Sequence, residues 1–160
     1  MIILEHDSNE IHERALTLFA TKAKRALGAR GELSIRITSS AEMRKLNRRF
    51  RRKNKPTDVL SFPSDMPRLA GDIAISAEIA AANAEQLGHP VDTELKILIL
   101  HGLLHLAGYD HETDDGEMQA KEAKLRQRLK LPVGLIERTN GKPSPARRRV
   151  ASAAPRGRRK

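Results

Sequence analysis

The sequence predicts a single α+β domain, a mixed α/β fold in which helices pack a roughly four-stranded mixed sheet around one central buried helix. Its 160 residues suit one domain. Strand-like and helix-like segments alternate along most of the chain. The segment 94–107, ELKILILHGLLHLA, is apolar on nearly every side, which is typical of a helix inside a domain rather than on its surface.

The first half of the chain predicts two strands, each followed by a helix. Apolar residues alternate or cluster in the strands, and small polar residues that can cap a helix precede each helical pattern. We expect a strand at 2–5, a helix from a cap at Ser8 or Asn9 to about residue 27, a strand at 32–38, and a helix from a cap at Ser39 or Ser40 to about residue 50.

The second half begins with a basic loop and then predicts two short strands and three helices. Ser76 is a candidate cap, and Gly88 with Pro90 separates the next two helices. The expected order is a loop at 51–57, strands at 59–62 and 72–76, helices at 77–87 and 94–107, and a charged amphipathic helix at 114–129.

Three histidines lie close together in the segment HGLLHLAGYDH. On a helix, His101 and His105 share a face about 6 Å apart along the axis, so both rings can bind one ion. If the helix continued to His111, that residue would lie about 15 Å beyond His101 and on another face. Gly108 can adopt the left-handed conformation that ends a helix, which would bring His111 back toward the other two.

Three imidazoles without a fourth protein ligand nearby indicate the catalytic type of zinc site, which keeps one position for water. We therefore expect one Zn²⁺ per chain on His101, His105 and His111, and predict that the central helix is the metal-binding helix. Burial favours the neutral imidazole that binds metal.

The same histidine spacing, with the same glycine, occurs in metzincin metalloproteases, but there a glutamate follows the first histidine. Here that position is Gly102. A glycine cannot act as the general base of peptide hydrolysis, so proteolysis is disfavoured. Gly102 leaves room either for a bulky or charged substrate or for close helix packing, and the sequence favours neither.

The positive charge is concentrated at the C-terminus. The net charge is +10, but the residues after 140 include eight Lys or Arg and no acid, which leaves 22 basic and 20 acidic residues, or +2, before them. We expect a folded domain at 1–138 and a basic, disordered tail at 139–160 that either binds phosphate-rich surfaces or only improves solvation.

Composition limits the partners and the location. Aromatic residues make up 2% of the chain, so nucleic-acid binding would rely mainly on charge. Cysteine is absent, which fits a reducing cytoplasm, and neither an export signal nor a membrane span is visible. We expect a soluble, cytoplasmic protein. The oligomeric state is not predicted.

Three segments resemble the YbeY endoribonucleases, also called rRNA maturation factors: the histidine segment 101–111, FRRKNKPTDVLSFP at 50–63 and GDIAIS at 71–76. They occur in the family's order and span most of residues 1 to about 135. The resemblance implies a zinc-dependent, single-strand-specific endoribonuclease. Its substrates would be ribosomal RNA, including the 3′ end of 16S rRNA, with the small ribosomal subunit as a partner and a role in ribosome quality control.

The resemblance also implies that Arg51 is important for activity. An arginine can bind a phosphate through two hydrogen bonds and stabilise the charge of a phosphoryl-transfer transition state. Arg52 and Lys53 are neighbouring candidates for substrate binding. Without the resemblance, each of these basic side chains would be interpreted as a solvated surface charge.

Two other functions remain open at this point. A metalloprotease-like hydrolase would need a base from elsewhere, such as Asp110 or Glu112. A non-catalytic ribosome-assembly factor would use the metal to stabilise the central helix, and its basic loop and tail to bind rRNA.

Overall fold

The structure is a computed structural model that describes residues 2–5, 9–51, 57–63, 69–110 and 113–136; for residues 51, 69 and 70 only the backbone is described. It contains a four-stranded sheet in the order β1-β2-β4-β3. The strands are β1 (Ile2–Leu4), β2 (Glu32–Thr38), β3 (Val59–Pro63) and β4 (Leu69–Ser76). The first, second and fourth run parallel, and β3 pairs antiparallel with β4 at the edge. The predicted mixed sheet is therefore confirmed.

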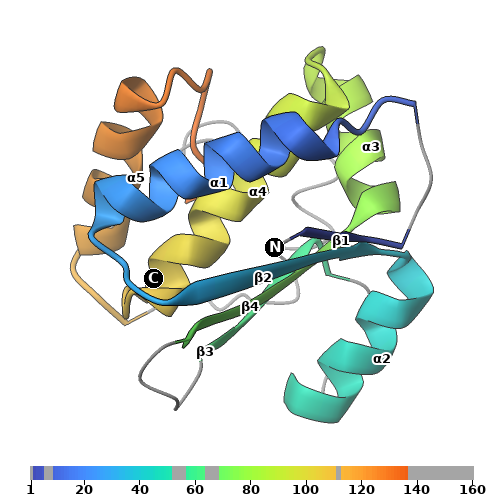
Figure 1. Ribbon diagram of the computed structural model, residues 1–160, viewed down its shortest axis with the longest axis horizontal. Coiled ribbons are helices and arrows are strands. Elements are labelled where there is room, and N and C mark those ends of the chain that lie inside the picture. Colours follow the sequence, from blue (N-terminus) through green and yellow to red (C-terminus); the bar gives the residue numbers. More distant parts are fainter. Residues whose placement is uncertain (1, 6–8, 52–56, 64–68, 111–112, 137–160) are drawn as a thin grey trace.

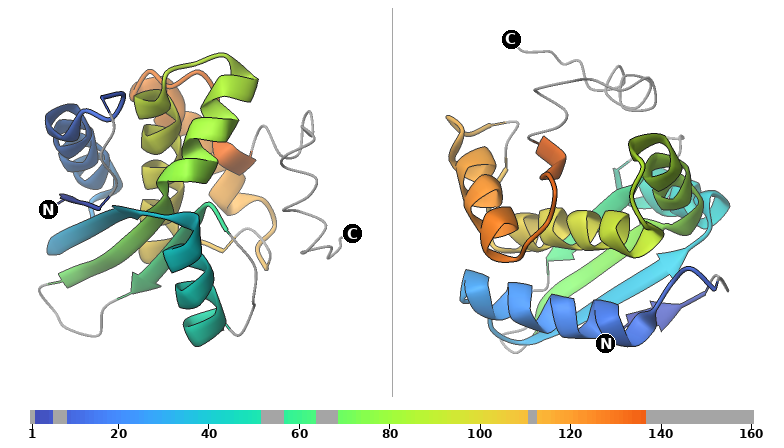
Figure 2. Two further views of the ribbon diagram at one scale, coloured as in Figure 1. Left: turned by 90° about the vertical axis from the view of Figure 1, so that its right-hand side faces the viewer. Right: turned by 90° about the horizontal axis from the view of Figure 1, so that it is seen from above.

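Helices cover both faces of the sheet, but unequally. One face carries α1 (Glu13–Leu27), α3 (Ala77–Leu87), α4 (Val91–Leu106) and α5 (Glu117–Arg128), while α2 (Ser40–Arg51) lies on the other (Figures 1 and 2). The α4 helix contributes an almost continuous run of buried residues, and its apolar side chains join those of β2, β4, α1 and α5 in one core. Its predicted place at the centre is thus confirmed. Because the helix contacts the sheet and three other helices, it is apolar on nearly every side.

A smaller core lies beneath α2. Met43, Leu60 and Ala74 are buried there, with Leu46 and Phe62 packed against them. This cluster fixes α2 on the face opposite α4. No helix among the residues that the structure describes is long and apolar enough to cross a membrane.

The predicted starts of three helices, α1, α4 and α5, were wrong. The α1 helix begins at Glu13 rather than after Ser8 or Asn9, because His12 is held against α4: its backbone N–H donates to Asp92 at 3.0 Å, and its Nδ1 lies 2.6 Å from the other carboxylate oxygen. The α5 helix begins at Glu117 rather than at 114. The Asp114 carboxylate instead accepts the N–H groups of Gly116 and Met118 at 2.9 Å each, and so closes the turn that precedes the helix.

The other caps follow the sequence more closely. Ser39 accepts the N–H of Glu42 at 3.1 Å at the start of α2, and Ser76 accepts the N–H of Ile79 at 3.1 Å at the start of α3. The α4 helix starts at Val91, three residues earlier than predicted, because Pro90 takes the N-cap position. The β4 strand starts at Leu69 rather than 72, since it continues to pair with the first residues of β2.

Candidate functional site

The two helical histidines of the predicted metal site face each other. The rings of His101 and His105 meet edge to face, with their centroids 4.8 Å apart. Two imidazoles that bind one zinc ion tetrahedrally through bonds of about 2.0–2.1 Å have centroids about 5 Å apart. His101 is buried and His105 is half-buried. The pair therefore fits two neighbouring zinc ligands, one of them well shielded from water.

The predicted turn after this pair is present. Gly108 has a φ of +102°, and its N–H donates to the carbonyl of His105 at 3.0 Å. The N–H of Tyr109 reaches back to Leu104 at 3.1 Å, so the helix is closed by a glycine-based C-terminal motif. His111 lies outside the described residues. Among the residues that are described, no three His, Cys, Asp or Glu side chains form a metal-binding group.

A buried carboxylate on α5 contacts the first histidine. The Nδ1 atom of His101 lies 3.4 Å from Oε2 of Glu122, and neither side chain is more than 7% exposed. Histidines that bind a metal through Nε2 commonly donate Nδ1–H to a carboxylate of this kind. Glu122 is therefore positioned to orient His101.

The C-terminal segment of the described chain holds this carboxylate in place. The other oxygen of Glu122, Oε1, accepts the backbone N–H of Ile136 at 2.8 Å. Gly134 packs so closely against the carboxylate that a side chain there would overlap it. Gly134 and Ile136 thus hold the carboxylate that contacts His101.

Glu122 was missed in the sequence, although a signal existed. It lies between Met118 and Leu125 on the apolar face of α5, and all three are buried. A carboxylate in the middle of an apolar helix face requires a buried partner. The sequence predicts that need but does not identify His101 as the partner.

The structure distinguishes between the two interpretations of Gly102. A Cβ on this residue would lie 2.9 Å from Cδ1 of Ile73 and 3.1 Å from Oγ of Ser61. Glycine here therefore allows α4 to pack directly on β3 and β4, rather than making room for a substrate. A glutamate at this position would point into the sheet.

The edge strand β3 contacts α4 at the same point. The hydroxyl of Ser61 donates to the carbonyl of Gly102 at 3.0 Å. Gly102 directly follows His101, so this bond fixes the backbone beside the histidine pair. Ser61 thus has a positioning contact beside the histidine pair.

The predicted phosphate-binding residues are only partly described. Arg51 is the last residue of α2, and its side chain is not described. Arg52 and Lys53 lie outside the described residues. Their roles in binding substrate therefore stay predictions.

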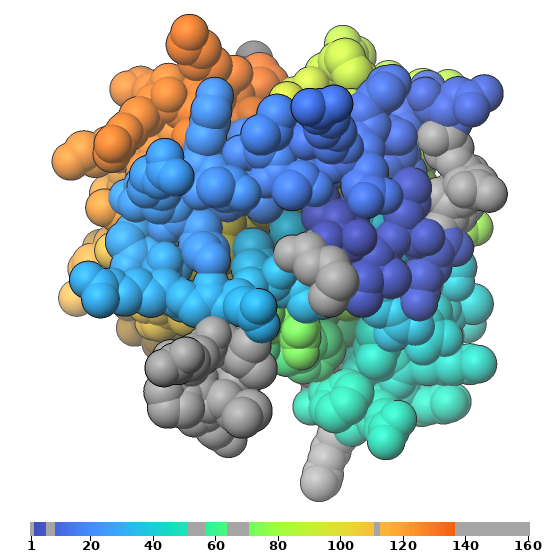
Figure 3. Space-filling model, in the orientation of Figure 1, coloured from blue at the N-terminus to red at the C-terminus, as the bar shows by residue number. Residues whose placement is uncertain are grey.

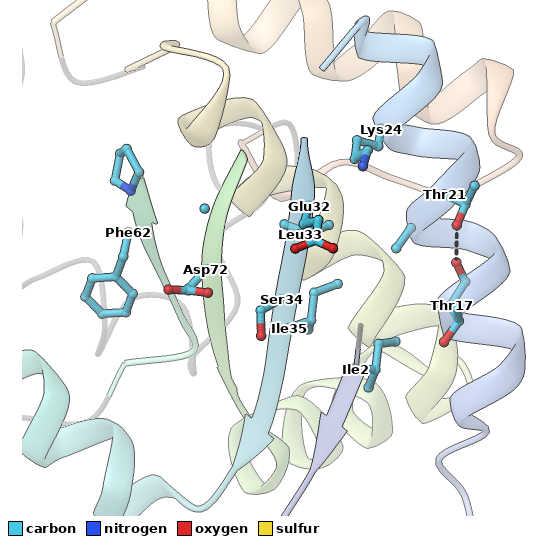
Figure 4. A pocket seen from close by; sticks show the side chains of 13 residues that line it. Ile2, Thr17, Thr21, Lys24, Glu32, Leu33, Ser34, Ile35, Phe62 and Asp72 are labelled. Atoms are coloured by element: carbon cyan, nitrogen blue, oxygen red, sulfur yellow. Dashed lines mark hydrogen bonds between the residues drawn. The ribbon is translucent and has the colours of Figure 1, made fainter. Parts of the chain in front are cut away.

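A pocket of about 630 Å³ lies at the start of β2. Thr17, Thr21 and Lys24 of α1 line one side, and Phe62 and Asp72 of β3 and β4 line the other (Figure 4). Neither described histidine of the candidate metal site lines it.

These features define an α+β domain with a candidate metal centre on its central helix. The family model described as Endoribonuclease YbeY matches residues 2–130. The chain is 59% identical over 139 residues to the Endoribonuclease YbeY of Koribacter versatilis, covering 87% of this chain and 91% of the relative. It is 48% identical over 124 residues to that of Solibacter usitatus, covering 78% and 84%. The chain belongs to the YbeY family.

A solved structure agrees with the fold. The solution structure of a protein from Thermotoga maritima superposes with a TM-score of 0.58 at 31% identity, covering 81% of this chain and 89% of the other. The family predicted from the three sequence segments is thereby confirmed.

Proposed function

We propose that this protein is a zinc-dependent, single-strand-specific endoribonuclease that acts in ribosomal RNA maturation, including 16S rRNA 3′-end processing, and in ribosome quality control. The observation that carries the proposal is the His101–His105 pair on the central helix of a YbeY-family chain, with ring centroids 4.8 Å apart. The names of the relatives support the endoribonuclease activity. Ribosomal RNA and the small ribosomal subunit follow from the family resemblance.

Zinc would be held by His101 and His105 from α4 and by His111 after the Gly108 turn. When bound, it would lower the pKa of a water molecule toward neutrality and polarise a phosphoryl oxygen. Glu122, whose Oε2 lies 3.4 Å from Nδ1 of His101, would keep that ring oriented.

Arg51 is the residue proposed to bind the phosphate that is cleaved. It is the last residue of α2, and the edge strand β3 begins at Val59. A guanidinium there would bind the scissile phosphate and stabilise the negative charge that develops during cleavage. Arg52 and Lys53 would help to hold the RNA backbone near it.

The proposal is tested with purified protein whose zinc content is measured. We expect about one zinc per chain, cleavage of unstructured RNA, and little cleavage of duplex RNA. His105→Ala should lose both the zinc and the cleavage, whereas His12→Ala, the same substitution outside the motif, should keep both. Cleavage retained by a zinc-free His105→Ala protein would overturn the proposal.

The same assay separates the other functions. Salt-sensitive RNA binding without turnover would indicate a ribosome-assembly factor with a structural metal. Cleavage of peptides in place of RNA would indicate a metalloprotease-like hydrolase. The metalloprotease glutamate has no counterpart here, because Gly102 stands in its place and packs against Ile73 and Ser61.

A further inference from the structure

The exposed side of α2 is strongly basic. Four exposed residues form two rows on this helix, since Arg44 and Arg48 are four residues apart, as are Lys45 and Arg49. We call these four residues the basic face of α2. Glu42, the acidic residue of the helix, is half-buried and lies 3.4 Å from Arg36. The basic face therefore presents positive charge without an acidic residue among its members.

An aromatic pair lies beside the basic face. Phe50, in the last turn of α2, is 56% exposed although it is a large apolar residue. Its ring meets that of Phe62 on β3 at 5.2 Å in an edge-to-face arrangement, and the Arg49 guanidinium carbon lies 5.4 Å from the Phe50 ring centroid. The chain contains three phenylalanines and no tryptophan. Tertiary structure thus places two of its few aromatic rings at one surface.

This aromatic pair and the histidine pair are connected through one strand. Alternate residues of β3 point to opposite faces: Ser61 contacts Gly102 of the metal helix, whereas Phe62 packs on the α2 side. Because β3 is the edge strand, the two faces meet along its open side. The α2 helix lies at the molecular surface in Figure 3. The α2 surface and the histidine pair therefore lie on opposite faces of the sheet, beside the same edge strand.

We propose that the basic face of α2 and the Phe50 ring form a docking surface for single-stranded RNA outside the cleavage site. The inference rests on the proposed function. Phosphates bind Arg44, Lys45 and Arg48, and one unpaired base stacks on Phe50, with Arg49 beside the same ring. A positive surface with a stacking ring is the combination that binds single strands without sequence preference.

Asp72 determines which part of a nucleotide can lie over the Phe50 and Phe62 rings. Asp72 pairs with Phe62 across the strands, and its side chain lies next to that ring (Figure 4). A carboxylate repels phosphate but tolerates a neutral base. The base therefore lies over the phenylalanines, and the phosphates lie along the arginines. Duplex RNA, whose bases are stacked internally, lacks a free base for this position.

The first test uses a tryptophan as a reporter, because the chain has none of its own. Phe50→Trp is titrated with a single-stranded oligoribonucleotide, and Leu18→Trp is the matched control, since Leu18 on α1 is 59% exposed. We expect RNA to quench the emission of the Phe50 variant and to leave the Leu18 variant unchanged. Inorganic polyphosphate, which offers charge without bases, should quench neither. Equal responses of the two variants to RNA would overturn the proposal.

The second test measures affinity. Phe50→Ala should weaken single-stranded RNA binding about 5- to 100-fold, and Phe50→Leu should weaken it similarly because it removes the ring but keeps an apolar side chain. The double variant Arg44→Gln, Arg48→Gln should reduce the slope of log affinity against log salt by about 1.4, the value for two phosphate contacts on a single strand. Lys22→Gln with Arg25→Gln on α1 makes the same charge change and should leave the slope unaltered. Unchanged affinity in both Phe50 variants would refute the stacking contact.

Different results would contradict the docking surface and the nuclease function. If the wild-type protein cleaves RNA and the Phe50 variants bind and cleave as well as it does, the docking surface is wrong and the proposed function stands. If the Phe50→Trp signal and the affinity losses are found but no condition gives cleavage, the docking surface stands and the nuclease function is wrong.

Discussion

Nδ1 of His101 and Oε2 of Glu122 lie 3.4 Å apart inside the protein, and the contact joins α4 to α5. The carboxylate is itself fixed by the N–H of Ile136. The candidate metal helix is therefore supported by side chains and backbone groups that follow it in the sequence. If zinc binds His101 as proposed, the loss of the Glu122 contact should lower the affinity for zinc.

Glu122→Gln should lower zinc affinity about 10- to 100-fold, because the neutral amide holds the His101 ring less firmly than a carboxylate does. Competition with a chromogenic chelator measures the change without depending on catalysis. Glu94→Gln is the matched control. That glutamate is also buried, but it contacts His89 at 2.9 Å, a residue outside the metal motif, so its loss should affect stability and leave zinc affinity near wild type. Equal zinc affinities for wild type and Glu122→Gln would exclude the orienting role.

Gly102→Ala should destabilise the fold by about 1–3 kcal/mol, because the new methyl group overlaps Ile73 and Ser61 where α4 meets the sheet. Urea unfolding monitored by circular dichroism measures the loss. Ile73→Val removes the nearest atom, Cδ1, so the double variant should be more stable than the sum of the two single losses predicts. Strict additivity would argue against the overlap.

Arg51→Ala should keep zinc but slow RNA cleavage about 100- to 1000-fold, the loss expected when one group that stabilises a transition-state charge is removed. Zinc content and single-turnover rates are measured on the same sample. Arg51→Lys keeps the charge but loses the two-point geometry, and should recover only part of the rate. A cleavage rate that Arg51→Ala leaves unaltered would remove Arg51 from the site.

The ion pair between Glu5 and Arg36 predicts a pH-dependent contribution to stability. A 2.6 Å hydrogen bond from Arg36 lowers the pKa of the Glu5 carboxyl below its usual 4.5, and burial opposes this only partly. Because the folded pKa is the lower one, the stabilisation is present above pH 4.5 and is lost as the pH falls through the folded value.

Both side chains are more than a third exposed, so the contribution should be below about 1 kcal/mol. Glu5→Gln should therefore be slightly less stable than wild type at pH 7, and the difference should vanish in the acid range. Chemical unfolding at a series of pH values tests this, with Glu85→Gln on α3 as the control for loss of a carboxylate. A stability difference that persists unchanged at low pH would contradict the assignment.

The features that depend on short-range chemistry could be predicted from the amino-acid sequence. Strand alternation, the Ser76 cap, the four-residue spacing of His101 and His105 and the positive φ of Gly108 are properties of short segments. The starts of α1 and α5 were predicted less well because contacts from Asp92 and Asp114 determine where the chain enters each helix.

The groups that surround the histidines could not be predicted, because they come from distant parts of the chain. Glu122 is 21 residues from His101, and Ser61 is 41 residues from Gly102. The Phe50–Phe62 pair and the packing of Gly102 on Ile73 likewise join separate elements. Local patterns specify that a buried carboxylate needs a partner or that a glycine permits close approach, but the arrangement of helices on the sheet selects which neighbour is there.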